Sequence, residues 1–323
     1  MSRAVVTGGR GFIGSHLVER LLAQGDEVTV FDAVPRDARG QTAHVEGDIR
    51  DRDRLAAAII PGVDVVYHLA AVVGVDAYLS RPLDVIDINF NGTMNVLDLA
   101  TRADAKVVLA STSEVFGKNP AVPWREDGDR LLGATSADRW AYGTSKALGE
   151  HLTFAFARQH GLAATIVRYF NAYGPRQRPA YMVSRSVHRA LNGLPPVVYD
   201  GGRQTRCLTY VEDAVAGTLL AAAEPAATGE SFNIGSMDEV TVAEVVALIA
   251  ELTGIASPAV AVRTGERFGG AYEDLPRRVP DNAKARSVLG WKPETSLRDG
   301  LARTVAWARE NPGWLALPDS GAA

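Results

Sequence analysis

The chain has 323 residues, of which 46% are hydrophobic, and a formal net charge of −4. This composition is ordinary for a globular protein, and an acidic balance without any basic run argues against nucleic acid as a partner. The single cysteine, Cys207, permits no internal disulfide, and the six histidines lack the spacing of a metal site. No stretch of about 18 apolar residues indicates a membrane span. We therefore expect a cytoplasmic protein with no nucleic-acid or membrane partner and no metal.

The first half of the chain alternates short apolar runs with longer helical patterns. We expect strands at residues 4–8, 27–32, 43–48, 63–70, 105–111 and 164–171, and helices at 12–25, 51–60, 82–103 and 142–160. Strands that alternate with helices predict an α/β fold in which a parallel sheet is doubly wound, with helices on both faces. The apolar runs show no two-residue alternation, which fits strands that are covered on both sides.

The second half of the chain is less regular. After Pro175 turn-forming residues are frequent, with amphipathic helices at 240–254 and 296–310. We expect a first domain over residues 1–175 and a smaller C-terminal α/β lobe over residues 176–323. Parts of 203–235 are expected to return to the first domain.

A glycine-rich turn lies between the first predicted strand and the first predicted helix. The run "TGGRGFIG" contains Gly8, Gly11 and Gly14, which let the backbone approach a pyrophosphate at the helix N-terminus. The second predicted strand ends in Asp32, where a carboxylate can hydrogen-bond ribose hydroxyls and repel a 2′-phosphate. This pattern favours NAD over NADP as the cofactor. The alternative for Asp32 is a solvated strand end.

Two further segments carry groups suited to proton transfer. Tyr142 and Lys146 in "YGTSK" are four residues apart and therefore share one face of a helix. A neighbouring ammonium and the positive nicotinamide of NAD⁺ would lower the pKa of a phenol from about 10 and make it a base. The alternative is a surface pair. The run "STSEVFG" (111–117) places hydroxyls and a carboxylate after a buried strand, either because the chain surfaces there or because these groups reach a reacting molecule.

In their order and spacing, these segments resemble the extended short-chain dehydrogenase/reductase family. The matching runs are "TGGRGFIGSHL" (7–17), "YHLAA" (67–71), "INFNGT" (88–93), "STSEVFG", "YGTSK", "RYFNAYGPRQ" (168–177) and "RQTRCLTYVEDA" (203–214). The resemblance implies a Rossmann-type domain that binds NAD and a smaller lobe that binds a nucleotide sugar. It also implies an active triad of Thr112, Tyr142 and Lys146.

The resemblance extends the predicted cofactor site beyond the glycine turn. Asp48 and Ile49, after the third predicted strand, are expected near the adenine, and Asn89 near the nicotinamide side. The predicted cofactor-binding residues are Gly8, Gly11, Phe12, Ile13, Gly14, Asp32, Asp48, Ile49, Leu69, Ala70, Ala71, Asn89, Tyr142 and Lys146.

The residues after Thr112 distinguish activities within the family. Dehydratases of dTDP- or GDP-sugars carry an acid pair there and plain 4-epimerases usually carry small neutral residues, whereas this chain has Ser113 and Glu114. That pair resembles UDP-glucuronate decarboxylases, including the decarboxylase that acts in lipid A modification. The run "YEDLPRRVPD" (272–281) also resembles the latter enzyme and implies a catalytic Arg278. The alternatives are a structural ion pair for Glu114 and a surface position for Arg278.

The chemistry of a decarboxylase suits this set of residues. Once C4 of the sugar is a ketone, a carboxylate on C5 is β to a carbonyl and can leave as CO₂, with Thr112 and Tyr142 stabilising the enolate. Glu114 or Arg278 would then return a proton to C5. Ser113 lacks the acidity that loss of water would require.

The resemblance also implies the contacts with the nucleotide sugar. Arg206 and Asn171 would contact the diphosphate, and Val197 and Tyr199 would line the uracil. A solvated loop arginine, a turn residue and a core valine are the alternatives for Arg206, Asn171 and Val197. His68 is expected to be a packed, hydrogen-bonded residue rather than a base. The predicted substrate-binding residues are Thr112, Glu114, Asn171, Arg176, Val197, Tyr199, Arg206 and Arg278.

The sequence therefore predicts an NAD-dependent UDP-glucuronate decarboxylase that gives UDP-xylose, the UDP-4-keto-pentose or both. The alternatives are a UDP-hexose or UDP-glucuronate 4-epimerase, which uses the same triad, and a protein that binds NAD without catalysis. Family resemblance further implies a homodimer formed through the helices near 89–103 and 143–160.

Overall fold

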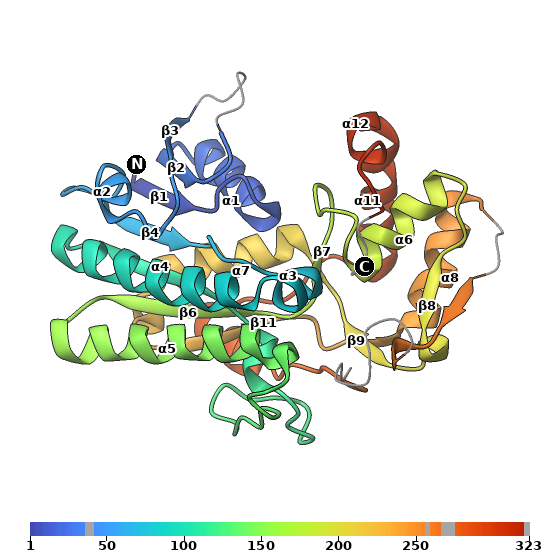
Figure 1. Ribbon diagram of the computed structural model, residues 1–323. Helices are drawn as coiled ribbons and strands as arrows, with labels where there is room; N and C mark the ends of the chain where they lie inside the picture. Colours follow the sequence, from blue (N-terminus) through green and yellow to red (C-terminus); the bar gives the residue numbers. More distant parts are fainter. Residues whose placement is uncertain (36–41, 256–258, 266–274, 320–323) are drawn as a thin grey trace.

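The computed structural model describes residues 1–35, 42–255, 259–265 and 275–319, so the first three residues of the run 272–281 lie outside the described residues. Among the described residues, the central element is a seven-stranded parallel sheet in the order β11-β6-β5-β4-β1-β2-β3 (Figure 1). Its strands are β1 (Arg3–Thr7), β2 (Glu27–Asp32), β3 (Ala43–Glu46), β4 (Val65–His68), β5 (Lys106–Thr112), β6 (Ala164–Tyr169) and β11 (Ser231–Ile234). This doubly wound sheet confirms the predicted fold class.

Helices cover both faces of the sheet. One face carries α1 (Phe12–Ala23) and α7 (Val211–Ala223), and the other carries α2 (Arg52–Ala56), α4 (Pro82–Ala103) and α5 (Ala141–His160). Successive strand residues point to opposite faces, so Val6 packs in the core with α1 and α7 whereas Val5 packs with α2 and α4. Neither valine is exposed, which explains the absence of alternation in the apolar runs.

Much of the chain after residue 175 forms a second lobe beside the carboxyl ends of the strands, whereas α7 and β11 belong to the sheet and its cover (Figure 1). The helices of the second lobe are α6 (Met182–Leu191), α8 (Val242–Thr253), α11 (Leu297–Glu310) and α12 (Pro312–Leu315), whereas α10 (Ala283–Leu289) packs against α7 and β11. Short strand pairs join them: β7 (Ala172–Tyr173) with β10 (Thr209–Tyr210), β8 (Val197–Tyr199) with β13 (Val260–Val262), and β9 (Thr205–Cys207) with β12 (Glu239–Thr241). One buried cluster runs from β1 through α7 to α8 and α11, so the two parts share a core.

Several elements near the cavity differ from the sequence prediction. The predicted strands 43–48 and 164–171 each end two residues early, at Glu46 in β3 and at Tyr169 in β6. The predicted strand 63–70 is longer than β4, because the chain leaves the sheet after His68 and residues 69–71 turn toward the cavity. A short helix that the pattern did not predict, α3 (Val75–Ser80), follows directly.

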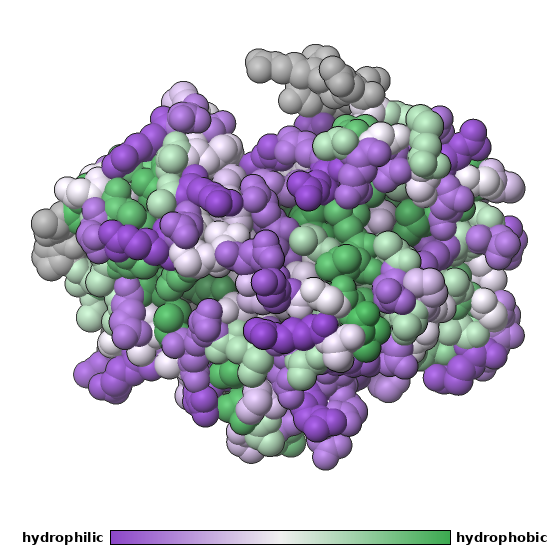
Figure 2. Space-filling view, turned by 180° about the vertical axis from the view of Figure 1, so that it is seen from behind, coloured by the Kyte–Doolittle hydropathy of each residue, from purple (hydrophilic) through white to green (hydrophobic). Residues whose placement is uncertain are grey.

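The face opposite to that of Figure 1 mixes hydrophilic residues with hydrophobic patches (Figure 2). Within the described ranges, no helix is both long enough and apolar enough to cross a membrane.

Candidate functional site

A cavity of about 770 Å³ lies at the carboxyl ends of the strands, with walls from the sheet and from the second lobe. Doubly wound sheets bind their ligands at this edge. Every residue of the predicted cofactor and substrate sites lines this cavity, with the exception of Asn89 and Arg176.

The glycine turn is held tightly against the neighbouring backbone. Gly8 has a φ of +70°, and a Cβ there would come within 2.7 Å of the backbone nitrogen of Ala70. A Cβ on Gly14 would overlap the carbonyl oxygen of Gly8. Helix α1 begins after Gly11 without any side-chain cap, so its first N–H groups face the cavity with no side-chain acceptor. These features fit the pyrophosphate of a dinucleotide.

Asp32 lies at the end of β2 and is both structural and available to a ligand. Its Oδ2 accepts the backbone N–H of Arg10 and its Oδ1 that of Val34, each at 2.9 Å. A carboxylate has about four acceptor positions, so two remain for ribose hydroxyls. Asp48 and Ile49 line the same end of the cavity, where the hydrogen bonds of Arg50 lower the pKa of Asp48. The residues present therefore fit NAD.

His68 belongs to a buried hydrogen-bonded chain rather than to the reacting groups. Its Nδ1 lies 2.8 Å from Thr7 Oγ1, and its Nε2 lies 3.0 Å from Thr93 Oγ1. Thr93 donates its own proton to the carbonyl of Asn89, so it accepts from Nε2. Burial, followed by the charge of Lys146, lowers the pKa of His68 to about 3 and keeps the ring neutral.

Asn89 does not line the cavity but anchors the segment that does. Its Oδ1 accepts the N–H of Val72 at 2.8 Å, and its Nδ2 donates to Val72 O and to Ser145 Oγ. Ser145 in turn donates to the carbonyl of Tyr142. Asn89 thus joins the cavity-lining segment after β4 to the helix that carries Tyr142 and Lys146.

Thr112, Tyr142 and Lys146 are brought together in the cavity, the first at the end of β5 and the other two on α5. Burial raises the pKa of Tyr142 above its usual range, the carboxylate of Glu114 raises it further, and a hydrogen bond with Thr112 acts against both. Burial also lowers the pKa of Lys146 to about 8. Burial therefore dominates the pKa of Tyr142 in the protein without NAD⁺, and the expectation that Lys146 and the nicotinamide together lower this pKa stays a prediction.

Glu114 lies in the 3₁₀ turn η1 (Ser113–Phe116), directly after β5, between two arginines. Its Oε2 accepts from Arg139 Nη1 and its Oε1 accepts from Arg278 Nη1 at 2.9 Å. Burial by itself would raise the pKa of Glu114, but the two guanidinium groups hold it at about 2. Glu114 is thus an anion at neutral pH and holds no proton to donate, whether to C5 or to a departing hydroxyl.

Arg278 faces the cavity beside the triad, and its Nε is buried without a hydrogen-bond partner among the described residues. A buried donor of this kind calls for an explanation, and an anionic ligand would supply one. Arg139, which the sequence analysis did not assign, is buried over the ring of Trp140. It occurs in "DRWAYGTSK" directly before the helix of Tyr142, which is the signal that could have identified it.

The second lobe contributes most of the predicted nucleotide-sugar residues. Asn171, Val197, Tyr199 and Arg206 line the cavity. The amide of Asn171 donates to Cys207 O at 3.1 Å, and Arg206 Nη1 donates to Thr205 O and Leu275 O, so both side chains are held in place.

The structure does not bring Arg176 into the cavity. Its guanidinium pairs with Glu19 of α1 at 2.7 Å, in a solvent-exposed ion pair. The neighbouring Gln177 lines the cavity instead.

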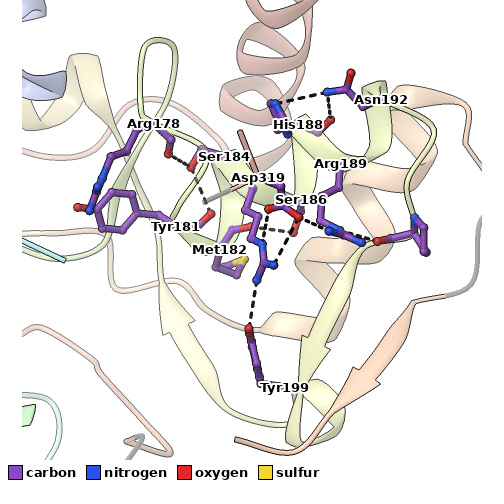
Figure 3. A network of polar contacts seen from close by, with 12 residues as sticks. Arg178, Tyr181, Met182, Ser184, Ser186, His188, Arg189, Asn192, Tyr199 and Asp319 are labelled. Atoms are coloured by element: carbon purple, nitrogen blue, oxygen red, sulfur yellow. Dashed lines mark hydrogen bonds and ion pairs between the residues drawn. The ribbon is translucent and has the colours of Figure 1, made fainter. Parts of the chain in front are cut away.

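Helix α6 brings two unpredicted arginines to the cavity wall. Figure 3 shows one of them, Arg189, in a polar network with Asp319. Arg185 and Arg189 are four residues apart, and Asp319 pairs with both; the Arg185 Nε to Asp319 Oδ1 distance is 2.7 Å. Arg185 Nη1 also donates to the hydroxyl of Tyr199 at 3.1 Å. The helical spacing is visible in the sequence, but the distant aspartate that balances their charge is not. No group of three His, Cys, Asp or Glu side chains suited to a metal occurs in the described ranges.

A doubly wound sheet with a glycine turn, an acidic strand end and a Thr/Tyr/Lys set in one cavity defines an enzyme of the short-chain dehydrogenase/reductase type. The model of the NAD dependent epimerase/dehydratase family matches residues 4–235. The chain belongs to this family, which confirms the resemblance drawn from its motifs and NAD as its cofactor.

Two curated relatives and one solved structure show which members of the family the chain is similar to. The chain is 41% identical over 318 residues to UDP-N-acetyl-alpha-D-glucosaminuronate decarboxylase of Bacillus cytotoxicus, covering 95% of this chain and 98% of the relative. It is 36% identical over 309 residues to UDP-glucuronic acid decarboxylase 1 of Arabidopsis thaliana. This match covers 94% of this chain and 69% of the relative. The solved structure of MoeE5 in complex with UDP-glucuronic acid and NAD has a TM-score of 0.85 and 32% identity, covering 96% of this chain and all of that one.

Proposed function

We propose that the protein is an NAD-dependent decarboxylase of UDP-glucuronate. It oxidises C4 of the sugar, loses CO₂ from C5 and gives UDP-xylose, the UDP-4-keto-pentose or both. The nucleotide lies between the end of β6 and the second lobe, with Asn171 and Arg206 at the diphosphate and Val197 and Tyr199 at the uracil.

The observation that carries this proposal is the charge arrangement beside the triad. Arg139 and Arg278 both pair with the carboxylate of Glu114, and the Nε of Arg278 is buried without a hydrogen-bond partner among the described residues. A sugar carboxylate accepts from such a donor through a charge-assisted hydrogen bond, which is stronger than one to the hydroxyl of a neutral hexose. Dehydration needs a group that protonates the departing hydroxyl, and Glu114, with a pKa of about 2, is not such a group.

The residues of the cavity then divide the reaction between them. Bound NAD⁺ supplies a hydride acceptor at C4 and, once reduced, a hydride donor. Tyr142 takes the proton of the C4 hydroxyl, and Thr112 holds the C4 oxygen in position. The carbon–carbon bond from C5 to the carboxylate breaks, CO₂ leaves, and its electron pair becomes the enolate that Tyr142 and Thr112 stabilise. C5 then takes a proton from a water held by Arg278, because Glu114 has none to give.

The relatives support a hexuronate and leave the group at C2 to be tested. The Arabidopsis relative is named for UDP-glucuronic acid, and the Bacillus relative for the sugar with an acetamido group at C2. Both sugars carry the C5 carboxylate on which the proposed chemistry depends.

The deciding experiment incubates the purified protein with NAD⁺ and either UDP-glucuronate or its 2-acetamido analogue, followed by mass analysis of the products. Loss of one CO₂ from UDP-glucuronate supports the proposal, and a further deficit of two hydrogens shows release of the ketone. CO₂ loss from the 2-acetamido sugar alone moves the substrate to that class. An unchanged mass with inversion at C4, detected by NMR, contradicts decarboxylation and identifies a 4-epimerase.

We also propose that two copies associate through α4 and α5 in the cytoplasm. The two helices lie side by side (Figure 1) and are joined by the hydrogen bond from Asn89 to Ser145. They expose Leu83, Ile86 and Leu148 to solvent, with Leu83 79% exposed. A second copy that presents the same two helices would bury this apolar surface in a four-helix bundle.

A further inference from the structure

A buried carboxylate lies directly behind the triad, outside the cavity lining. Glu150 is on α5, one turn after Lys146, and its side chain is 1% exposed. Its Oε1 accepts from Ser111 Oγ at 2.5 Å and from Arg168 Nε at 2.9 Å. Its Oε2 accepts from Arg168 Nη2 at 2.8 Å and from Arg130 Nη2 at 2.7 Å. The carboxylate is therefore fully satisfied.

The partners of Glu150 are the neighbours of cavity residues. Ser111 immediately precedes Thr112 on β5, and Arg168 immediately precedes Tyr169 on β6. In the sheet, Ser111 is paired with Arg168, as Thr112 is with Tyr169. The carboxylate of Glu150 thus joins α5, β5 and β6, which carry Lys146, Thr112 and Tyr169 to the cavity.

The carboxylate of Glu150 also lies close to several positively charged side chains. Arg168 on β6, Arg130 in the loop before α5 and Lys146 on α5 itself surround Glu150. From β4, Lys146 meets the neutral ring of His68. Burial lowers the pKa of Lys146, and Glu150 acts in the opposite direction. Burial raises the pKa of Glu150, but its arginine partners outweigh this effect and keep the pKa below its usual range.

We propose that Glu150 is a positioning residue for the reaction, which fixes Thr112 and Lys146 relative to each other and keeps the ammonium of Lys146 charged. Glu150 touches neither cavity nor substrate, and it acts through these two residues. The inference deepens the proposed function, but it concerns the oxidation at C4, which precedes any loss of CO₂.

The first test measures the protonation of Lys146 without any turnover. Lys146 in the full-length protein is acetylated with trace acetic anhydride between about pH 6 and pH 10. Mass spectrometry compares its reactivity with that of the exposed Lys292. In Glu150→Gln the midpoint moves down by about one pH unit, so Lys146, with a pKa of about 8 in the wild type, reacts about fivefold faster near pH 7. Glu150→Asp, which keeps the charge, restores the wild-type midpoint.

The second test separates positioning from stability. With the hexuronate that the protein turns over, Glu150→Gln lowers kcat about tenfold or more and leaves KM unchanged, because only the interaction with the transition state is lost. The high-pH limb of kcat moves to lower pH. The matched control is Glu126→Gln, which removes another partly buried carboxylate near Arg168 that binds the backbone N–H of Asn233. We expect Glu126→Gln to lower Tm and to leave the high-pH limb of the kcat profile at the wild-type pH.

An unchanged midpoint for Lys146 in Glu150→Gln overturns the proposal, as does a loss of kcat that only follows the loss of Tm. If Glu150→Gln does not fold, Ser111→Ala and Glu150→Asp replace it. Both keep the charge, so we expect a wild-type midpoint and a lower kcat; a wild-type kcat in both variants overturns the proposal. A protein that turns over no hexuronate contradicts the proposed function alone, since the acetylation test needs no substrate.

Discussion

At the scale of single residues, Tyr142 is the group on which the proposed chemistry depends most directly. Its phenol is buried and neutral in the protein alone, and it hydrogen-bonds with Thr112. We expect Tyr142→Phe to lower kcat by about 10²–10⁴-fold, because it removes the proton acceptor for the C4 hydroxyl. NAD affinity, measured by calorimetry, should stay nearly unchanged.

Tyr181→Phe provides the matched control for this variant. Tyr181 lines the same cavity, and burial raises the pKa of its phenol as well. It lies in the second lobe rather than on α5, and we expect its variant to keep most of the wild-type kcat. Full activity of Tyr142→Phe would show that another group is the base.

Glu114 should make stability depend on pH. Its pKa is about 4.5 in the unfolded chain and about 2 in the folded protein, so its contribution is present above pH 4.5 and is lost as the pH falls through about 2. At pH 7, Glu114→Gln removes the carboxylate that Arg139 and Arg278 both contact, and we expect a loss of about 3–5 kcal/mol in the free energy of unfolding.

Urea denaturation at several pH values checks this expectation. The difference between wild type and Glu114→Gln should shrink as the pH falls below 4.5. The control is Glu251→Gln, which removes an exposed pair with Arg298 and should change the free energy of unfolding little at every pH, because such pairs are screened by solvent. A constant difference between pH 7 and pH 3 would mean that Glu114 acts by packing and not by charge.

Residues that share a helix face or follow a strand could be placed from the sequence, and residues paired over long distances could not. The four-residue spacing predicts that Tyr142 and Lys146 lie together. The pairing of Arg185 and Arg189 with Asp319 depends on how α6 meets the end of the chain, which no local pattern encodes. Burial likewise depends on the whole fold, which is why the sequence did not reveal that burial raises the pKa of Tyr142 in the protein without NAD⁺.

At the scale of elements, the join between β1 and α1 tolerates no side chain at Gly14. A Cβ there overlaps the carbonyl oxygen of Gly8, so Gly14→Ala must push the start of α1 away from the strand. We expect NAD binding to weaken about tenfold or more in calorimetry, which is about 1.4 kcal/mol. Gly313→Ala, where a Cβ meets open space, is the control and should bind NAD as wild type does. Equal affinity in both variants would show that the cofactor does not contact this turn.

Strands were easier to predict than the points where they end. The apolar run 27–32 matches β2 in full, because both faces of that strand are covered and it is bounded by a turn and an acidic end. The run 63–70 continues as an apolar segment beyond β4, since residues 69–71 line the cavity rather than the sheet. Hydrophobicity alone does not distinguish a sheet strand from a cavity wall.

At the scale of the whole molecule, the apolar surface of α4 and α5 predicts the oligomeric state. We expect the double variant Leu83→Glu and Leu148→Glu to be monomeric in analytical ultracentrifugation, because charge at the centre of a helical bundle is costly to bury. The control is Leu194→Glu in the second lobe, whose residue is 41% exposed against 42% for Leu148. It should leave a dimer intact. A wild-type monomer at micromolar concentration would contradict the proposed association.

The place of β11 also governs the order in which the molecule is made. β6 ends at Tyr169 and β11 begins at Ser231, so about 60 residues, which include α6 of the second lobe and α7, are synthesised between two strands that pair in the sheet. At a synthesis rate of about 5–20 residues per second, the outer edge of β6 stays unpaired for about 3–12 s before β11 is made. An open edge is a template for wrong pairing. This interval is therefore when a nascent chain of this protein has most need of a chaperone.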